Sequence, residues 1–155
     1  MSEREQRLVD LGYPLDKTSP EGQLVDAVVI VGSILYASGQ VPFDGSQLVS
    51  KGKVPSQVNV EDATRAAALC AANVLRCIRK HIGSLDAIER VIRITGYVNS
   101  DADFTDQHLV INGASQLVRA VFGEAGRHAR SALGMAQLPL GASTEVEMIL
   151  ELKQK

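Results

Sequence analysis

The chain has 155 residues, of which 45% are hydrophobic and 22% charged, and its formal net charge is −2 at pH 7. This length and balance are typical of one folded globular domain and exclude a chain that is disordered throughout. The slight negative charge and an aromatic content of only 4% disfavour a nucleic-acid-binding surface, so no nucleic acid partner is expected.

The hydrophobic residues are too scattered for a membrane protein. The longest apolar run, residues 27–37, is shorter than the ~18 residues that a membrane-spanning helix needs. The N-terminus has no apolar signal segment, and the two cysteines, seven residues apart in a predicted helix, are too distant to form a disulfide with each other. These features predict a cytoplasmic protein without a membrane partner.

Helices and strands can be placed in chain order from caps, turns and hydrophobic spacing. Ser2 and Glu5 form a capping-box pattern for a short helix that ends at Gly12, so residues 1–21 are predicted to be an N-terminal helix and connector within a single domain, 1–155. Short apolar runs at 28–31 and 34–37 flank Gly32-Ser33 and predict a β-hairpin. Residues 41–54 contain turn residues and predict turns with one weak strand.

The second half of the chain alternates between helix and strand patterns. Asn59 is a suitable N-cap for a helix over 60–82 that ends at Gly83, and residues 87–99 are rich in strand-forming residues. A second helix is predicted over 106–122, with Thr105 as its cap and Gly123 as its end. Two more strands are predicted over 129–138 and 144–152. The order predicts an α+β fold, in which two long helices cover one face of a mixed sheet.

The inventory of catalytic residues is small. His81, His108 and His128 lack the spacing of metal ligands, and the chain has neither a phosphate-binding loop nor a dinucleotide fingerprint. We therefore expect no metal and no cofactor, and we interpret the histidines as surface or helix-end residues.

One charged residue stands out on an otherwise apolar strand. Arg130 cannot lose its charge, so it requires either a structural carboxylate or the carboxylate of a ligand. Glu145 and Glu147 share one face of the last predicted strand, a pattern that is usually a solvated face.

Three further segments carry a pattern in this order: residues 36–42 (YASGQVP), 98–112 and 129–147. They resemble, in turn, the strand end, the central strand and helix, and the C-terminal signature of the RidA (YjgF) family of reactive-intermediate deaminases. Members of this family also carry the names endoribonuclease L-PSP and translation inhibitor. The length of the chain and the Val98-Asn99-Ser100 segment resemble a longer, less characterised branch.

The resemblance implies a chorismate-mutase-like protomer that assembles as a homotrimer, with ligand clefts between protomers. It assigns Arg130 to the carboxylate of a small metabolite and Glu145 to the catalytic water. The other residues that it places in the substrate-binding cleft are Asn112, Ser38, Gly39, Ser131 and Ala132.

Two positions depart from the family pattern. Ala132 stands where a cysteine is frequent, and Gly22-Gln23-Leu24-Val25 offers no aromatic residue where the family has a cleft tyrosine. The missing phenol removes a polar contact that could orient the substrate, and both changes affect which substrate is accepted.

The predicted pairing of the last two strands also bears on the cleft between protomers. If 129–138 and 144–152 form a hairpin about Gly141, Glu145 lies opposite Gln137 and ~23 Å from Arg130, at 3.3 Å per residue. One chain then cannot bring both side chains to one small ligand, whereas two chains can.

The predicted function is hydrolysis of small reactive 2-imino or enamino acids to 2-keto acids and ammonia, by an imine deaminase without cofactor. Two alternatives stay open. The first is a non-catalytic, regulatory trimer that binds a small carboxylate, and the second is the endoribonuclease or translation inhibitor that the family name suggests.

Overall fold

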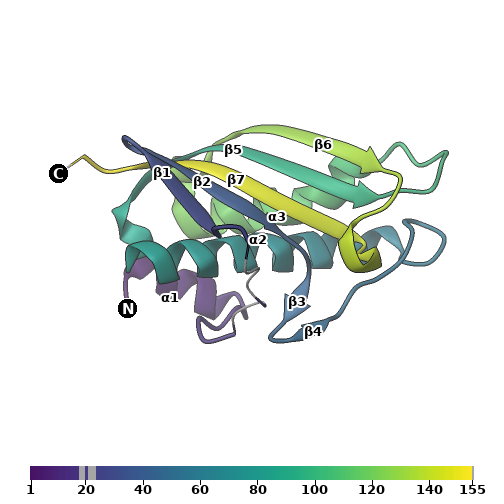
Figure 1. Cartoon of the computed structure of the whole chain (residues 1–155), viewed down its shortest axis with the longest axis horizontal. Coiled ribbons are helices and arrows are strands. Elements are labelled where there is room, and N and C mark those ends of the chain that lie inside the picture. Colours follow the sequence, from purple (N-terminus) through teal and green to yellow (C-terminus); the bar gives the residue numbers. More distant parts are fainter. Residues whose placement is uncertain (18–19, 21–23, 155) are drawn as a thin grey trace.

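The structure, a computed structural model, describes residues 1–17, 20 and 24–154. A five-stranded sheet in the order β1-β2-β7-β5-β6 forms one layer, and the long helices α2 and α3 form a second layer on one of its faces (Figure 1). The α+β architecture predicted from the sequence is confirmed. The elements are α1 (Glu3–Asp10), β1 (Val28–Val31), β2 (Ile34–Gln40), β3 (Phe43–Asp44), β4 (Gln47–Leu48), α2 (Val60–Ile82), β5 (Ile88–Asn99), α3 (Gln107–Phe122), β6 (Ala129–Met135) and β7 (Thr144–Leu152), with 3₁₀ turns at Leu85–Ala87, Gly123–Gly126 and Pro139–Gly141.

Helix α2 has the bounds that its end signals predict. The side chain of Asn59 accepts a hydrogen bond from the Asp62 backbone N–H at 2.8 Å, which satisfies one of the donors left open at a helix start. Gly83 ends the helix with a φ of 87°, a backbone conformation that residues other than glycine rarely adopt.

Helices α2 and α3 touch each other at Gly113. A Cβ atom at this position would lie 2.0 Å from the backbone oxygen of Thr64 on α2, so only glycine permits the observed approach. The start of α3 differs from the prediction by one residue, because Asp106 rather than Thr105 occupies the N-cap, and its side chain makes no capping hydrogen bond.

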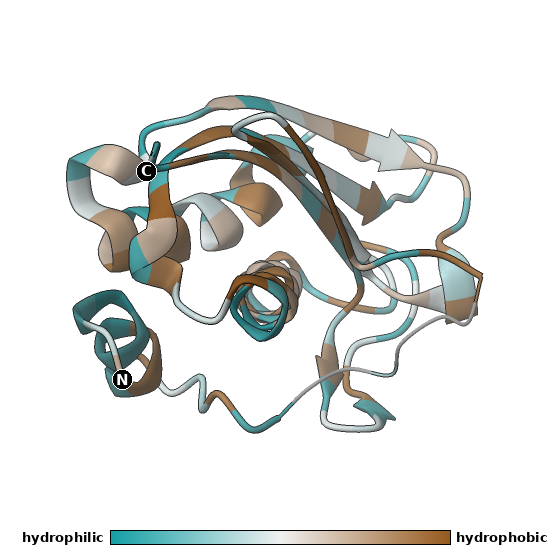
Figure 2. Ribbon diagram, turned by 60° about the vertical axis from the view of Figure 1, so that its left-hand side comes forward, coloured by the Kyte–Doolittle hydropathy of each residue, from teal (hydrophilic) through white to brown (hydrophobic). Residues whose placement is uncertain are grey.

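The hydrophobic core lies between the sheet and the two long helices. On β7, Val146, Met148 and Leu150 are buried and alternate with less buried residues, as expected for a strand with one face on the core. Figure 2 shows α2 close to end-on beneath the sheet, with its hydrophobic side toward the strands.

Strand β2 contains a bulge at Ser38 and Gly39, two of the predicted site residues. Ala37 pairs with Met148 and Gln40 pairs with Val146, so two residues of β2, Ser38 and Gly39, oppose a single residue of β7. The extra residue bends the strand and redirects the neighbouring side chains. The predicted hairpin of β1 and β2 is confirmed, with Val31 opposite Ile34.

The last two strands do not form the predicted hairpin. β6 pairs in parallel with β5, with Arg130 opposite Ile94, while β7 pairs antiparallel with the other edge of β5. The reason is the connection: β5, α3 and β6 form a strand–helix–strand crossover, which brings its two strands side by side in parallel. The short antiparallel pair β3–β4 likewise replaces the single weak strand predicted within 41–54.

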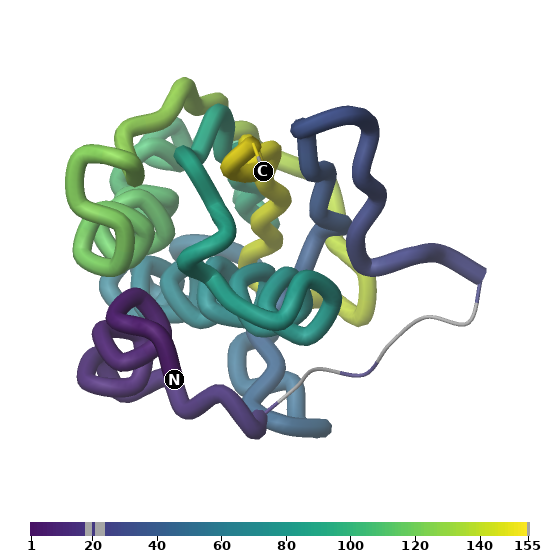
Figure 3. Tube along the Cα trace, turned by 90° about the vertical axis from the view of Figure 1, so that its left-hand side faces the viewer, coloured from purple at the N-terminus to yellow at the C-terminus, as the bar shows by residue number. Residues whose placement is uncertain are grey.

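The N-terminal helix packs against the helical layer. Its predicted capping box, between Ser2 and Glu5, is present. Arg7 donates a hydrogen bond to the backbone oxygen of Val121 at the end of α3, and Figure 3 shows α1 and the β1–β2 hairpin on different sides of the molecule. In the part of the chain that the structure describes, no helix has the length and apolar character to cross a membrane.

Candidate functional site

Arg130 projects from β6 toward helix α3, where polar groups surround its guanidinium. Its Nη1 donates to Asn112 Oδ1 at 2.9 Å and to Ser115 Oγ at 3.2 Å, and its Nη2 donates to the backbone oxygen of His108 at 3.4 Å. The structure thus brings together Arg130 and Asn112, two of the sequence-predicted site residues. Within residues 1–17, 20 and 24–154, Arg130 is in no ion pair, so a structural carboxylate is not its partner there.

Three other predicted residues, Ser38, Gly39 and Glu145, meet at the bulge of β2. A Cβ atom on Gly39 would lie 2.2 Å from Oε1 of Glu145, so the carboxylate occupies the space that any other residue would fill. The φ of Gly39 is not in the left-handed region, and the glycine is needed for room rather than for its backbone angle. Ser38 Oγ donates to the backbone oxygen of Asp26 at 2.6 Å, which fixes the hydroxyl against the segment that precedes β1.

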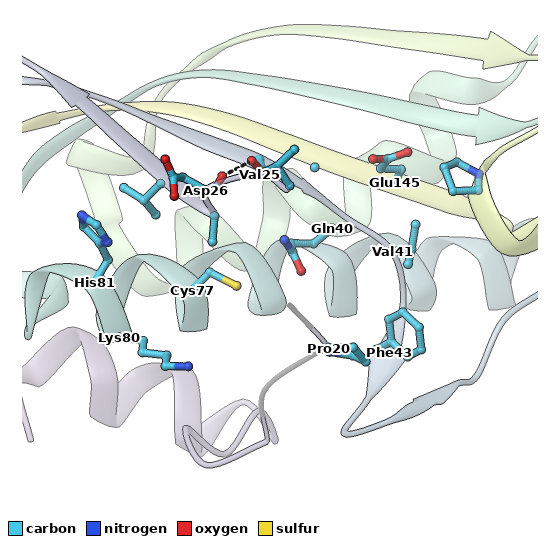
Figure 4. Close-up of a pocket in the computed structure, with 15 residues that line it drawn as sticks. Pro20, Val25, Asp26, Gln40, Val41, Phe43, Cys77, Lys80, His81 and Glu145 are labelled. Carbon is cyan, nitrogen blue, oxygen red and sulfur yellow. Dashed lines mark hydrogen bonds between the residues drawn. The ribbon is translucent and has the colours of Figure 1, made fainter. Parts of the chain in front are cut away.

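A cavity of about 600 Å³ lies at the end of β2, next to residues 25–28, where β1 begins (Figure 4). Glu145 lies at one end of it, and His81 on α2 lies at the other. The cavity is lined by Ser38, Gly39 and Glu145 together with Cys77, His81 and Phe43, among others.

The carboxyl group of Glu145 is poised to act as a base. Burial raises its pKa above the ordinary value of 4.5, and the negative charge of Glu147 raises the pKa further. A carboxylate with a raised pKa accepts a proton more readily once it is ionised. Tyr97 Oη donates to Glu147 Oε1 at 3.0 Å, so the neighbouring carboxylate is held in place.

Arg130 and Glu145 of one chain lie on opposite faces of the sheet. Arg130 contacts α3 on the helix-covered face, whereas Glu145 alternates with the buried Thr144 and Val146 and projects from the other face. The estimate of ~23 Å between them is wrong because it assumed the hairpin. In the observed register Arg130 lies level with Ile94 and Met148, which gives ~14 Å between the two Cα positions, at 3.3 Å per residue and 4.8 Å per strand. One chain still does not point both side chains at one ligand.

Ser131 and Ala132 point to different faces of the edge strand β6. Ser131 Oγ accepts a hydrogen bond from Arg93 Nη2 at 2.6 Å on the open face of the sheet, and Ala132 packs partly against the core. Because β6 is an edge strand, backbone groups along its outer side remain available for a ligand. In the segment 22–25, which has no aromatic residue where the family has a cleft tyrosine, Gly22 and Gln23 lie outside the described residues. Val25 of the same segment lines the cavity.

The structure corrects the interpretation of one histidine. His128 is half-buried with both ring nitrogens in hydrogen bonds, so it is not a surface residue. Both cysteines are buried, and Cys77 also lines the cavity. Burial raises the pKa of Cys70 to about 12. Among the described residues, no group of three or more His, Cys, Asp or Glu side chains could hold a metal ion.

Sequence reasoning did not identify Ser115 and His128 as neighbours of the arginine. Two spacings could have indicated them. Ser115 is three residues after Asn112 and therefore shares its face of α3, and His128 is two residues before Arg130 and therefore shares its side of the chain as β6 begins. The cavity residues of α2 gave no comparable signal, because their neighbours in space come from distant parts of the sequence.

Comparisons with known proteins identify the family and the fold. Residues 5–152 match the model of a family described as "YjgF/chorismate mutase-like, putative endoribonuclease". The protein TCP17 of Trypanosoma cruzi is 38% identical over 143 residues, which cover 92% of this chain and 89% of that protein.

Solved structures are similar over almost the whole chain. Protein Atu1372 of Agrobacterium tumefaciens, whose function is unknown, is 44% identical and superposes with a TM-score of 0.90 over 97% of this chain and 92% of its own. RidA of the Antarctic bacterium Psychrobacter has 24% identity and a TM-score of 0.60 over 88% of this chain and 95% of its own, a likeness of fold. The matched residues include both halves of the site, and the chain belongs to the RidA/YjgF family.

Proposed function

We propose that the protein hydrolyses small 2-imino acids, and their enamine tautomers, to 2-keto acids and ammonia. The observation that carries this proposal is the guanidinium of Arg130, which Asn112 and Ser115 hold in place without an ion pair in the described part of the chain. Such a group fits the carboxylate of a small ligand. The nearby outer edge of β6 offers backbone donors and acceptors for the imine nitrogen.

The second half of the proposed site is Glu145 on a neighbouring copy. Because Arg130 and Glu145 project from opposite faces of one sheet, we propose a homotrimer in which Arg130 of one protomer faces Glu145 of the next. The family resemblance supports three copies, and the exposed Tyr36 and Leu133 on the open face of the sheet support burial of that face between copies.

The chemistry needs one water and one base. Glu145 takes a proton from water as the oxygen attacks C2 of the imine, which forms a carbinolamine. The imine is protonated on nitrogen when it is attacked, so the carbinolamine is neutral. Glu145 then returns its proton to the nitrogen, the carbon–nitrogen bond breaks, and the hydroxyl proton passes to Glu145 as the carbonyl forms, which releases ammonia and the keto acid. Arg130 supplies orientation by holding the carboxylate throughout.

The test is a deaminase assay in which an amino-acid oxidase generates the imino acid in solution and loss of the imine is followed. Arg130→Ala is expected to lower kcat/KM roughly 10- to 150-fold, the range for a lost hydrogen-bonded charge contact. Glu145→Gln is expected to lower kcat about 100-fold or more, as for a general base. The matched controls are Arg90→Ala and Glu89→Gln, which change exposed residues of β5, and normal activity of Arg130→Ala would refute the proposal.

A mixing experiment tests whether the site is shared. Arg130→Ala and Glu145→Gln are unfolded together, refolded as mixed assemblies and assayed. If each site takes Arg130 from one copy and Glu145 from another, ~25% of the sites in a random equal mixture are intact. A site within one copy would give no recovery.

Carboxylate binding without turnover is the second candidate function. The observation in its favour is that the arginine half of the site is complete within one chain, whereas Glu145 is on the opposite face. Binding of a keto acid to wild-type protein, with no faster loss of any imine, would establish this alternative.

A further inference from the structure

A chain of three hydrogen bonds leads from Arg130 to the interior of the β6–α3 junction. Arg130 Nη1 donates to Ser115 Oγ at 3.2 Å, Ser115 Oγ lies 2.9 Å from His128 Nε2, and His128 Nδ1 lies 2.7 Å from the backbone oxygen of Gly126. The two links beyond Ser115, to His128 and to Gly126, were not used in the proposed reaction.

The chemistry of the end groups fixes the direction of the two outer bonds in this chain. A backbone carbonyl only accepts, so His128 must carry a proton on Nδ1 in order to donate to Gly126. A guanidinium only donates, so Ser115 Oγ accepts from Arg130 and keeps one hydrogen and one lone pair for His128 Nε2. In a neutral imidazole protonated on Nδ1, Nε2 has a lone pair and the Ser115 hydroxyl donates to it.

The surroundings of His128 favour this neutral form. Burial lowers the pKa of His128 below 6.5, and the positive charges of Arg130 on β6 and Arg119 on α3 lower it further, against the hydrogen bond to Gly126, which raises it. Glu124 lies within 3.4 Å of Arg119 and 2.9 Å of Arg127, so the nearby carboxylate is paired with other cations.

We propose that neutral His128 is a positioning residue that orients the Ser115 hydroxyl and, through it, the guanidinium of Arg130. The proposal rests on the proposed role of Arg130 as the anchor for a ligand carboxylate. His128 itself does not touch the ligand. With the hydroxyl of Ser115 fixed on His128, its lone pair faces Arg130 Nη1, and Nη2 is held only by the longer contact to the His108 oxygen. The site that results is selective for ligands with a planar, bidentate carboxylate.

The test measures binding of a stable product analogue, 2-oxobutyrate, by calorimetry, so that it does not depend on turnover. Ser115→Ala and His128→Leu are each expected to weaken binding about 3- to 10-fold, the range for one lost hydrogen bond. The double variant is expected to bind no more weakly than Ser115→Ala alone, because His128 acts only through Ser115. In the imine assay the single variants should raise KM and leave kcat within about twofold.

Control measurements separate positioning from a general structural role. Arg127→Gln alters an exposed residue next to His128 and should bind like wild type. The melting temperature of each variant is recorded, and His128→Gln, which keeps a polar side chain without titrating, replaces His128→Leu if the latter does not fold. Imidazole nitrogen NMR signals of the wild type should show a protonated Nδ1 and a bare Nε2.

The outcomes distinguish this inference from the proposed function. Wild-type binding by His128→Leu, additive losses in the double variant or a protonated Nε2 would overturn the role of His128 while Arg130→Ala still fails to bind. Equal binding by wild type and Arg130→Ala, or no binding by wild type, would overturn the anchor role itself and the inference with it.

Discussion

Replacing Gly39 with alanine should disable Glu145 without disturbing the fold. The added Cβ would lie 2.2 Å from Glu145 Oε1, 3.1 Å from its Cδ and 3.3 Å from its Cγ. A normal contact requires the carboxylate to move by about 1 Å, since non-bonded heavy atoms prefer separations near 3.5 Å. Displacement of a catalytic group by that distance costs roughly 100-fold in rate.

Stability should change little in the same variant. The atoms that must move are the end of a flexible side chain rather than backbone. The alanine also reduces the conformational entropy of the unfolded chain, which stabilises the folded state by about 0.4–1 kcal/mol. The expected result is therefore a loss of about 100-fold in kcat, with a melting temperature within a few degrees of wild type. Activity within threefold of wild type would show that the position of Glu145 is irrelevant to the reaction.

Two further predictions test the electrostatics of the site and the packing beneath it. Glu147→Gln removes the negative charge that raises the pKa of Glu145, so the acid limb of the kcat/KM profile, measured from about pH 4 to 8, should shift to lower pH; an unshifted limb would exclude Glu145 as the titrating base. Gly113→Ala forces a Cβ to within 2.0 Å of the Thr64 backbone oxygen and should destabilise the fold by about 2 kcal/mol, within the usual range for overpacking. Calorimetry should show a fall in melting temperature of roughly 4–8 °C, and a Gln116→Ala control on the exposed side of α3 should not.

The sequence predicts best where the determining interactions are local. The bounds of α2 depend on Asn59 and Gly83, which act within one turn of the helix, and both are where expected. Which strand β6 pairs with depends on contacts between segments that are far apart in the sequence. The hydrophobic periodicity of a strand does not indicate its neighbour in the sheet. The helix between β5 and β6 was a usable signal, since parallel strands need such a crossover, yet the assumed hairpin overrode it.

The same distinction holds for the candidate site. Arg130 could be found because a charge on an apolar strand demands a partner, whereas Asn112 was found only through the resemblance to the family, and the structure brings the two to 2.9 Å. The bulge that places Glu145 over Gly39 could not be predicted, because it is a mismatch between two strands that are far apart in the sequence. His81 and Cys77 line the cavity together with residues of β2 and of the segment before β1, which lie far from α2 in the sequence.

The environment of Glu145 also predicts that replacing it raises stability while it lowers activity. Its pKa is raised by burial and by Glu147, so the folded state binds the proton more tightly than the unfolded state does. Stability therefore falls as the pH rises from the unfolded pKa through the folded one, and the full penalty is present at neutral pH.

Glu145→Gln removes this penalty, and its melting temperature should exceed that of wild type at pH 7, with the difference disappearing below about pH 4, where both states are protonated. A variant that is both less active and more stable would indicate that the fold tolerates an unfavourable charge at the position where the reaction uses it. Equal melting temperatures at both pH values would mean instead that Glu145 is an ordinary solvated side chain, and carboxylate binding without turnover would become the better interpretation.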